Sequence, residues 1–206
     1  MRDQEFWDER YSAESRVWSG NPNVQLVSDT ADLATGAALD AGAGEGADAL
    51  WLARQGWTVT AVDISPVALN RGAAQAAEAG TDVADRIQWV PADLTTWAPP
   101  PATYDLVSAQ FLQLPAEQRI PLFARLAASV APGGTLLIVG HHPSDMQTAV
   151  SRPSMPDLYF TAEEVAETLD PTEWDAVTET RPRTVTDATG HPATIHDAVL
   201  RARRRR

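Results

Sequence analysis

The chain has 206 residues and no cysteine, and its 16 basic and 28 acidic side chains give a net charge of −12 at pH 7. This length predicts one domain, and the lack of cysteine excludes disulfides, thiolate metal sites and cysteine nucleophiles. The polar start has no secretory pattern, and no apolar run approaches the roughly 20 residues of a membrane span, so we expect a cytoplasmic protein without membrane contact. The acidic charge argues against a nucleic-acid partner, because phosphate contacts require a basic surface.

Five arginines stand in the last six residues of the sequence. Without them the chain would carry a charge of −17, so the rest of it is strongly acidic. The cluster could form an anion-binding arm, but a solvated terminus is the simpler interpretation.

From about Ala37 onward, short apolar runs alternate with longer helical ones. Ser65-Pro66 has the pattern of a helix N-cap followed by proline, and Pro132-Gly133-Gly134 ends a later helix. Thr161 and Glu164 have the spacing of a capping box. The patterns predict strands near residues 38–40, 57–63, 86–90, 104–109 and 135–140, and helices near 45–55, 65–79 and 117–130.

Two more strands are expected near residues 174–180 and 193–200, with no helix between them. Strand–helix alternation predicts right-handed crossovers and a parallel sheet, whereas two consecutive strands predict an antiparallel hairpin at one edge. The expected fold class is therefore α/β: a doubly wound, mostly parallel seven-stranded sheet with helices on both faces and a C-terminal antiparallel hairpin.

A glycine-rich loop, Asp40-Ala41-Gly42-Ala43-Gly44-Glu45-Gly46, lies between the first expected strand and its helix. Such glycines let the backbone approach a ligand, and the following helix offers free N–H groups. The loop could instead be an ordinary tight turn, but a turn accounts less well for three glycines at alternate positions after an acidic residue. The G-x-G-x-G spacing differs from the dinucleotide fingerprint, and Asp40 would repel a pyrophosphate, so a ligand with a cationic centre and an ammonium fits better.

Two further acids stand where the next expected strands end. Asp63 can accept from both hydroxyls of an adenosine ribose, and Asp93 from an adenine amine, because strand ends face the ligand crevice of an open α/β sheet. Each acid alone could instead cap a helix or lie in a solvated turn. Together with Asp40 they predict a crevice for a positively charged nucleoside.

The pattern resembles the class I S-adenosylmethionine-dependent methyltransferases of the small-molecule type, in the group related to the tellurite-resistance and thiopurine methyltransferases. The resemblance covers roughly residues 36–142. Its elements are the glycine loop, Ala61-Val62-Asp63-Ile64-Ser65, Ala92-Asp93-Leu94, Tyr104-Asp105-Leu106-Val107 and Pro132-Gly133-Gly134. Residues 6–11 and 17–22 also resemble the N-terminal cap of this group. Ala43 is a departure, because many relatives carry cysteine there.

The resemblance implies that the glycine loop holds the methionine part of S-adenosylmethionine, Asp63 the ribose, and Asp93 with Leu94 the adenine. Residues 108–111 would face the methyl group. The expected cofactor-binding residues are Trp18, Asp40, Gly42, Gly44, Asp63, Ile64, Asp93, Leu94 and Gln110. We expect a single domain over residues 1–206, with a cap or lid at 1–35, the cofactor-binding core at 36–142, and the late helix and edge hairpin at 143–206.

Methyl transfer from a sulfonium is an in-line displacement that needs positioning and a water-poor cavity, and no metal is required. His141 and His142 follow an apolar strand and are the candidate bases, although a loop-capping role explains them equally well. With Asp145 they form a sparse set of metal ligands on one loop, which we reject because no second shell is visible. His196 is expected to be structural.

Aromatic residues precede the sheet and recur near its expected carboxyl edge. They are typical of an apolar wall for a flat acceptor, although packing of the N-terminal segment on the core explains some of them. The expected substrate-binding residues are Tyr11, Phe111, His141 and Tyr159.

The sequence therefore predicts methyl transfer to S, N or O of a small aromatic or heterocyclic acceptor by a monomer or homodimer. Three alternative functions remain open. They are a non-catalytic S-adenosylmethionine-binding module, an RNA methyltransferase, which the acidic charge disfavours, and a nicotinamide dehydrogenase, which Asp40 and the glycine spacing disfavour.

Overall fold

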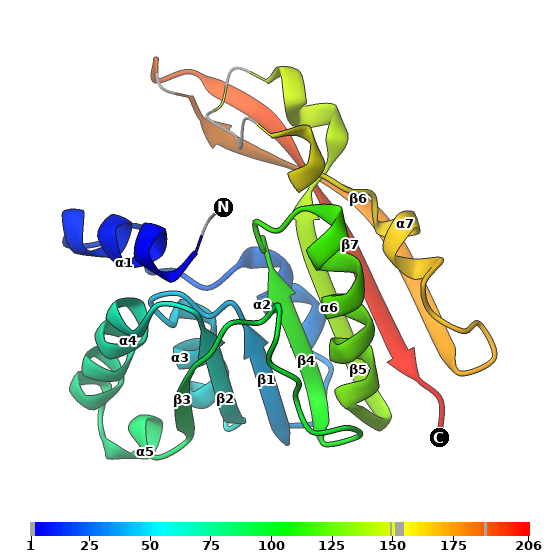
Figure 1. The fold of residues 1–206 in the computed structure, drawn as a ribbon, viewed down its shortest axis with the longest axis horizontal. Coiled ribbons are helices and arrows are strands. Elements are labelled where there is room, and N and C mark those ends of the chain that lie inside the picture. The colour runs from blue at the N-terminus through cyan, green and yellow to red at the C-terminus, as the bar shows by residue number, and fades with distance from the viewer. Residues whose placement is uncertain (1–2, 149, 151–154, 188) are drawn as a thin grey trace.

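A single seven-stranded sheet runs through the computed structural model, which describes residues 3–148, 150, 155–187 and 189–206 (Figure 1). Strands β1 to β5 pair in parallel, and β7 is antiparallel to both of its neighbours, β5 and β6. The strand order is β3-β2-β1-β4-β5-β7-β6. The expected doubly wound sheet with a C-terminal antiparallel hairpin is confirmed. The strands are β1 (Ala37–Ala41), β2 (Thr58–Asp63), β3 (Ile87–Pro91), β4 (Tyr104–Gln110), β5 (Val130–His141), β6 (Trp174–Thr186) and β7 (Pro192–Arg204).

Helices cover both faces of this sheet. One apolar cluster joins the sheet to α2 (Val24–Thr30), α3 (Ala47–Arg54) and α4 (Pro66–Ala79). A second cluster joins the opposite face to α6 (Ala116–Ser129) and α7 (Ala162–Ala166). Helix α1 (Gln4–Ala13) lies outside these layers, above the carboxyl ends of the parallel strands and beside α4 (Figure 1). The short elements are α5 (Thr81–Ala84) and the 3-10 turns η1 (Pro143–Gln147) and η2 (Pro156–Leu158).

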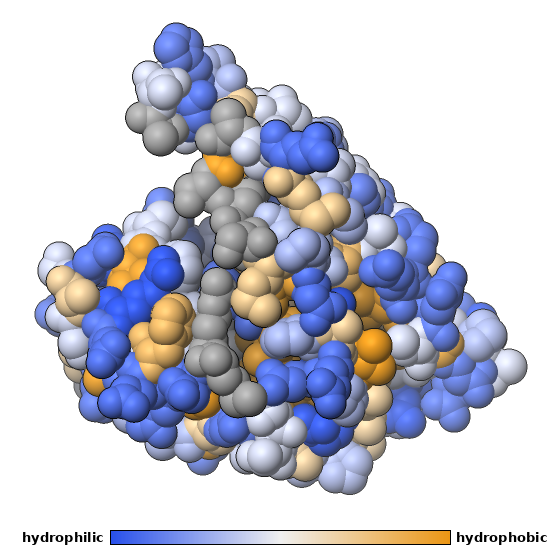
Figure 2. Space-filling model, turned by 45° about the horizontal axis from the view of Figure 1, so that its top comes forward, coloured by the Kyte–Doolittle hydropathy of each residue, from blue (hydrophilic) through white to orange (hydrophobic). Residues whose placement is uncertain are grey.

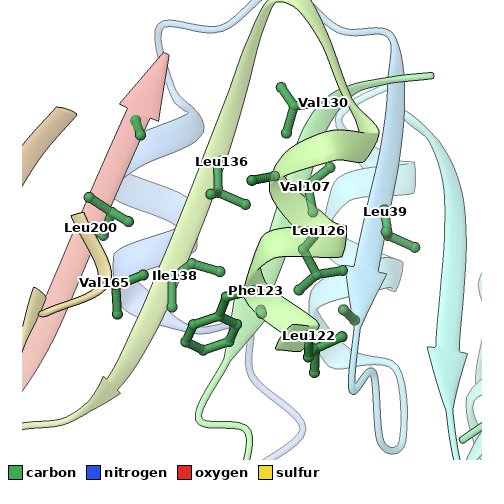
Figure 3. Packing of buried hydrophobic residues seen from close by; sticks show 14 of the residues in the cluster. Leu39, Val107, Leu122, Phe123, Leu126, Val130, Leu136, Ile138, Val165 and Leu200 are labelled. Atoms are coloured by element: carbon green, nitrogen blue, oxygen red, sulfur yellow. The ribbon is translucent and has the colours of Figure 1, made fainter. Parts of the chain in front are cut away.

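Alternation along the central strands divides the core between the two faces. In β5, Leu136 and Ile138 belong to the cluster beneath α6, whereas Leu137 and Val139 belong to the opposite one. Figure 3 shows Phe123 and the leucines of α6 directed at these strands. Full burial of such a side chain contributes about 1.5–3 kcal/mol, so a continuous apolar run is stable only when both faces are covered.

Helix caps form where the sequence predicts them. The Ser65 Oγ accepts a hydrogen bond from the Ala68 N–H at 3.2 Å, and Pro66 occupies the first turn of α4. Thr161 and Glu164 form the reciprocal capping box of α7.

The C-terminal arginines depart from expectation. The two hairpin strands are longer than predicted, and Arg201 and Arg204 lie in β7. Arg201 forms an ion pair with Asp32 at 2.8 Å, and Arg204 donates to the Val130 carbonyl at 2.8 Å. The prediction of a solvated terminus is wrong for these residues, because Arg201 pairs with both β5 and β6 and Arg204 pairs with β6.

Of the expected segments, the cap includes residues 1–2 and the late segment includes 149, 151–154 and 188, which lie outside the described residues. Within the described residues, no helix is long and apolar enough to cross a membrane.

Candidate cofactor and acceptor site

A cavity of about 900 Å³ opens where the parallel strands end. The glycine loop and the residues that follow β2, β3 and β4 line it, together with the N-terminal segment and Arg183 of the hairpin. In Figure 2 the end of the hairpin stands away from the body and the surface is hollowed beneath it. Carboxyl ends of strands in open α/β sheets are the usual place for a ligand.

Backbone geometry explains why glycine occupies the loop. Gly44 has φ +53°, and a Cβ there would lie 2.9 Å from the Tyr11 Oη. Gly46 has φ +80°, and a Cβ there would lie 2.3 Å from a ring carbon of Trp89. The Gly42 N–H donates to the Val62 carbonyl at 2.8 Å and fixes the loop over the sheet. A side chain in this loop would strain the backbone and displace the aromatic residues around it.

Asp40 is a buried carboxylate on the cavity wall, with 2% of its surface exposed. Within the described part of the chain, its Oδ2 has no hydrogen-bond partner. Burial, followed by the charges of Asp48 and Asp63, raises the pKa of Asp40 well above its usual range. An unsatisfied buried oxygen on a residue that lines a cavity fits an ammonium group, which would supply both the missing donor and the opposite charge.

Asp63 is also buried, and backbone N–H groups hold its carboxylate. Gly44 donates to Oδ2 at 2.8 Å and Ser65 donates to Oδ1 at 2.9 Å. Burial raises its pKa, and these backbone bonds oppose the rise. Each carboxylate oxygen has a further lone pair, so the side chain can still accept from two ligand hydroxyls.

Asp93 lies on the cavity wall beyond β3, with its carboxylate exposed. Its Oδ1 accepts from the Thr95 N–H at 2.8 Å and from the Thr95 hydroxyl at 2.7 Å, so the residue stabilises a turn. Both bonds fall on one oxygen, which leaves acceptor capacity on the carboxylate for a ligand amine.

Two carboxylates attach the N-terminal segment to the glycine loop and α3. Glu45 accepts from the N–H groups of Val17 and Trp18 at 3.1 and 3.2 Å, and Asp48 accepts from the Asn23 N–H at 2.7 Å. The Trp18 Nε1 donates to the Tyr11 Oη at 2.9 Å above Gly44. Burial raises the pKa of Tyr11 to about 12, so the hydroxyl stays protonated.

Aromatic rings line the cavity where β4 and β5 end. Phe111 has φ +53°, a conformation that costs a non-glycine residue of order 1 kcal/mol or more and is found most often at functional sites. Its ring centroid lies 4.9 Å from that of His141 and 5.7 Å from the Arg183 Cζ. The Gln110 Nε2 donates to the buried Ser108 hydroxyl at 2.9 Å.

Most of the predicted site residues meet in this one cavity, although their roles toward a ligand stay predictions. The lining includes Tyr11, Trp18, Asp40, Gly42, Gly44, Asp63, Ile64, Asp93, Leu94, Gln110, Phe111 and His141.

His142 and Tyr159, which were expected at the site, are not among the described residues that line the cavity. His142 caps η1 by accepting from the Ser144 N–H at 3.2 Å, which is the loop-capping interpretation. Tyr159 packs on His141, with ring centroids 6.0 Å apart. The His196 Nδ1 bonds to Asp145 at 3.0 Å, in accord with a structural role. Among the described residues, no group of three or more His, Asp or Glu side chains is placed to hold a metal ion.

Sequence reasoning did not single out Glu45, Asp48 or Arg183. Glu45 and Asp48 stand in or just after the glycine loop, and their acidic side chains beside the glycines were the signal that could have identified them. Arg183 enters the cavity only because β6 continues to Thr186, and its position depends on the register Arg183↔Ile195 with β7. No local pattern in the sequence reveals that register.

Comparisons with known proteins agree with this geometry. Residues 38–134 match the family described as a methyltransferase domain. Over 123 residues the chain is 35% identical to uncharacterized methyltransferases of Mycobacterium tuberculosis and Mycobacterium bovis, a match that covers 59% of this chain and 59% of each relative.

Solved structures share the fold. One, from work on the conversion of a disulfide bond into a thioacetal group during echinomycin biosynthesis, is 24% identical with a TM-score of 0.75, and the match covers 98% of this chain and 92% of that one. TehB from Haemophilus influenzae is 19% identical with a TM-score of 0.70, over 97% and 66% of the two chains. The glycopeptide N-methyltransferase MtfA, complexed with S-adenosylmethionine, is 17% identical with a TM-score of 0.66, over 98% of both chains.

Residues 38–134 are thus similar to a methyltransferase domain, and the strand order of the sheet is that of the Rossmann-like methyltransferase fold.

Proposed function

We propose that the protein transfers a methyl group from S-adenosylmethionine to S, N or O of a small, planar acceptor. The unsatisfied, buried Oδ2 of Asp40, a residue that lines the cavity together with the glycine loop, is the observation that carries the proposal. A cationic amino-acid moiety at this place would satisfy the carboxylate, whereas a pyrophosphate would be repelled by it.

The residues around the cavity suit each part of the cofactor. Asp40 and the glycine loop would hold the methionine part, Asp63 the ribose hydroxyls, and Asp93 with Leu94 the adenine. When bound, the cofactor supplies an activated methyl group on a sulfonium. The protein would then contribute position and the exclusion of water, because displacement at an activated methyl disperses charge.

The acceptor would lie against Phe111 and His141, beyond Gln110 at the end of β4. Phe111 supplies an apolar face, and the His141 imidazole is the candidate group for taking a proton from the acceptor. The N-terminal segment, held by Glu45 and by the Tyr11–Trp18 bond, would act as a lid over the cofactor. On the sequence pattern of residues 36–142, we propose that the protein is related to the tellurite-resistance and thiopurine group.

Two measurements on the full chain test the proposal. Isothermal titration with S-adenosylhomocysteine is expected to show binding, and titration with NAD is expected to show none. Formation of S-adenosylhomocysteine from S-adenosylmethionine is then followed with thiols, phenols, heterocyclic amines and halide or chalcogen anions. Binding of NAD in place of S-adenosylhomocysteine would refute the proposal, and cofactor binding with no turnover across the panel would favour a non-catalytic binding module.

A further inference from the structure

Charge is divided unequally around the cavity. Its carboxylates include Asp40, Asp48 and Asp63 on the side of the glycine loop, where a sulfonium and an ammonium would be favoured. The arginines of the described lining are Arg16, beside Gly20 in the N-terminal segment, and Arg183, beside Phe111. Arg183 therefore places a positive charge beside Phe111, outside the part of the cavity that we assign to the cofactor.

The Arg183 guanidinium is oriented by a buried partner. Its Nε donates to the Asp197 Oδ2 at 2.7 Å, and Asp197 is 0% exposed. Gln25 of α2 donates to the same oxygen at 3.0 Å and fixes the carboxylate in turn. The guanidinium Cζ lies 5.7 Å from the Phe111 ring centroid, within the range of a cation–π contact. The arginine is therefore held in place before any ligand arrives.

The remaining donors of this guanidinium are available. Within the described part of the chain, every recorded hydrogen bond of Arg183 uses Nε, so the two terminal nitrogens keep their donors for a ligand. Two parallel N–H groups at the end of a guanidinium match the two oxygens of a carboxylate. Phe111, whose backbone is strained, lines the cavity beside this guanidinium, and the His141 ring lies next to it.

We propose that Arg183, Phe111 and His141 form an acceptor subsite for a planar aromatic acid, with the ring against Phe111 and the carboxylate on the Arg183 terminal nitrogens. This inference rests on the proposed function and narrows its substrate class from small planar molecules to aromatic carboxylates. A neutral acceptor of the same shape would leave the arginine donors in a partly desolvated site without a partner, which disfavours its binding.

The test uses a matched pair of probes, naphthalene-2-carboxylate and naphthalene-2-carboxamide. Their dissociation constants are measured by ligand-observed NMR on the full chain saturated with S-adenosylhomocysteine. The carboxylate is expected to bind roughly tenfold more tightly than the amide, as for a charge-assisted pair of hydrogen bonds. A ratio near one in the wild-type protein would overturn the subsite.

Two variants assign that ratio to Arg183. The double variant Arg183→Gln/Asp197→Asn removes both charges, so no buried carboxylate is left unpaired, and its ratio is expected to fall to about one. If the double variant does not fold, Arg183→Lys is measured in its place. Lysine can keep the ion pair with Asp197, but it lacks the two parallel terminal N–H groups that would bind a carboxylate. A tenfold ratio that persists in the folded variant would place the anion elsewhere and overturn the proposal.

Arg16→Gln is the matched control, since it removes the other cavity arginine. The ratio is expected to persist in this variant, and its loss would assign the anion to Arg16 instead. Titration with S-adenosylhomocysteine precedes each experiment and separates the two levels of inference. Absence of cofactor binding would refute the proposed function, whereas cofactor binding without preference for the acid would refute the subsite alone.

Discussion

Replacing Asp40 by asparagine changes one buried oxygen and leaves the shape of the cavity nearly intact. A charge-assisted hydrogen bond is worth about 1.5–3 kcal/mol, so loss of the carboxylate should weaken S-adenosylhomocysteine by about ten- to a hundredfold. The same change relieves the cost of burying an unsatisfied charge. Removing that cost is expected to stabilise the ligand-free protein by about 1 kcal/mol at neutral pH, which raises Tm by about 2–4 °C.

The dependence on pH follows from the raised pKa of Asp40. Because the folded chain binds this proton more tightly than the unfolded chain, the contribution of Asp40 to stability is full below the unfolded pKa and is lost as pH rises through the folded pKa. Ligand binding has the opposite slope, since an ammonium favours the ionised carboxylate and affinity should rise over the same interval. Both slopes should be shallower in Asp40→Asn, although Asp48 and Asp63, whose pKa values burial also raises, maintain part of them.

Calorimetry and thermal unfolding measure these effects together. Titrations in buffers of different ionisation enthalpy count the protons released on binding, and Asp40→Asn should release fewer than the wild type. Asp32→Asn is the control, because it also removes one negative charge, but from an exposed residue that pairs with Arg201 away from the cavity. A folded Asp40→Asn protein with unchanged affinity for S-adenosylhomocysteine would refute the assignment of an ammonium to Asp40.

Other predictions concern the ribose, the lid and the absence of a metal requirement. Asp63→Ala should weaken S-adenosylhomocysteine roughly tenfold or more in calorimetry, because it removes the acceptor for two hydroxyls, and a folded variant with wild-type affinity would contradict that role. Deleting residues 1–22 should leave a folded domain with poor cofactor retention and little turnover, since Tyr11 is the buried residue of α1; a folded truncation with full affinity and rate would reduce the segment to packing. Trp18→Phe should abolish most of the fluorescence change on cofactor binding, and an undiminished signal would place Trp18 away from the ligand. Turnover should survive EDTA, because the methyl group is already activated; loss reversed by one divalent metal would refute this.

The parallel part of the fold was predictable because both of its signals are local. Apolar runs such as residues 135–140 alternate with helical segments, and Ser65 and Thr161 mark helix starts with side chains that cap the backbone. The presence of the C-terminal hairpin was predictable, but the length of its strands was not. Beyond Thr180 the residues of β6 alternate between half-buried and exposed, so its extent depends on pairing with β7 and cannot be found from hydropathy.

The cofactor side of the site was predictable for a geometric reason. Asp40, Asp63 and Asp93 follow strands that run in parallel, and the carboxyl ends of parallel strands share one edge of the sheet. The acceptor side lacked such a rule. Arg183 reaches Phe111 through the register of a long hairpin, and the support from Gln25 to Asp197 joins residues far apart in the sequence. Contacts of this kind are set by the packed fold.

The position of β7 between β5 and β6 also constrains the order in which the sheet can assemble. β6 precedes β7 in the chain but has no neighbour in the sheet until β7 arrives, and β5 exposes an apolar edge for the same period. Pairing of residues 192–204 with β5 is therefore a late, non-local step, and such steps slow folding and expose an unpaired edge to other chains. Arg183 and Asp197 meet when β6 pairs with β7, but they reach His141 and Phe111 only when this hairpin joins β5, so the acceptor side would be the last part of the cavity to form.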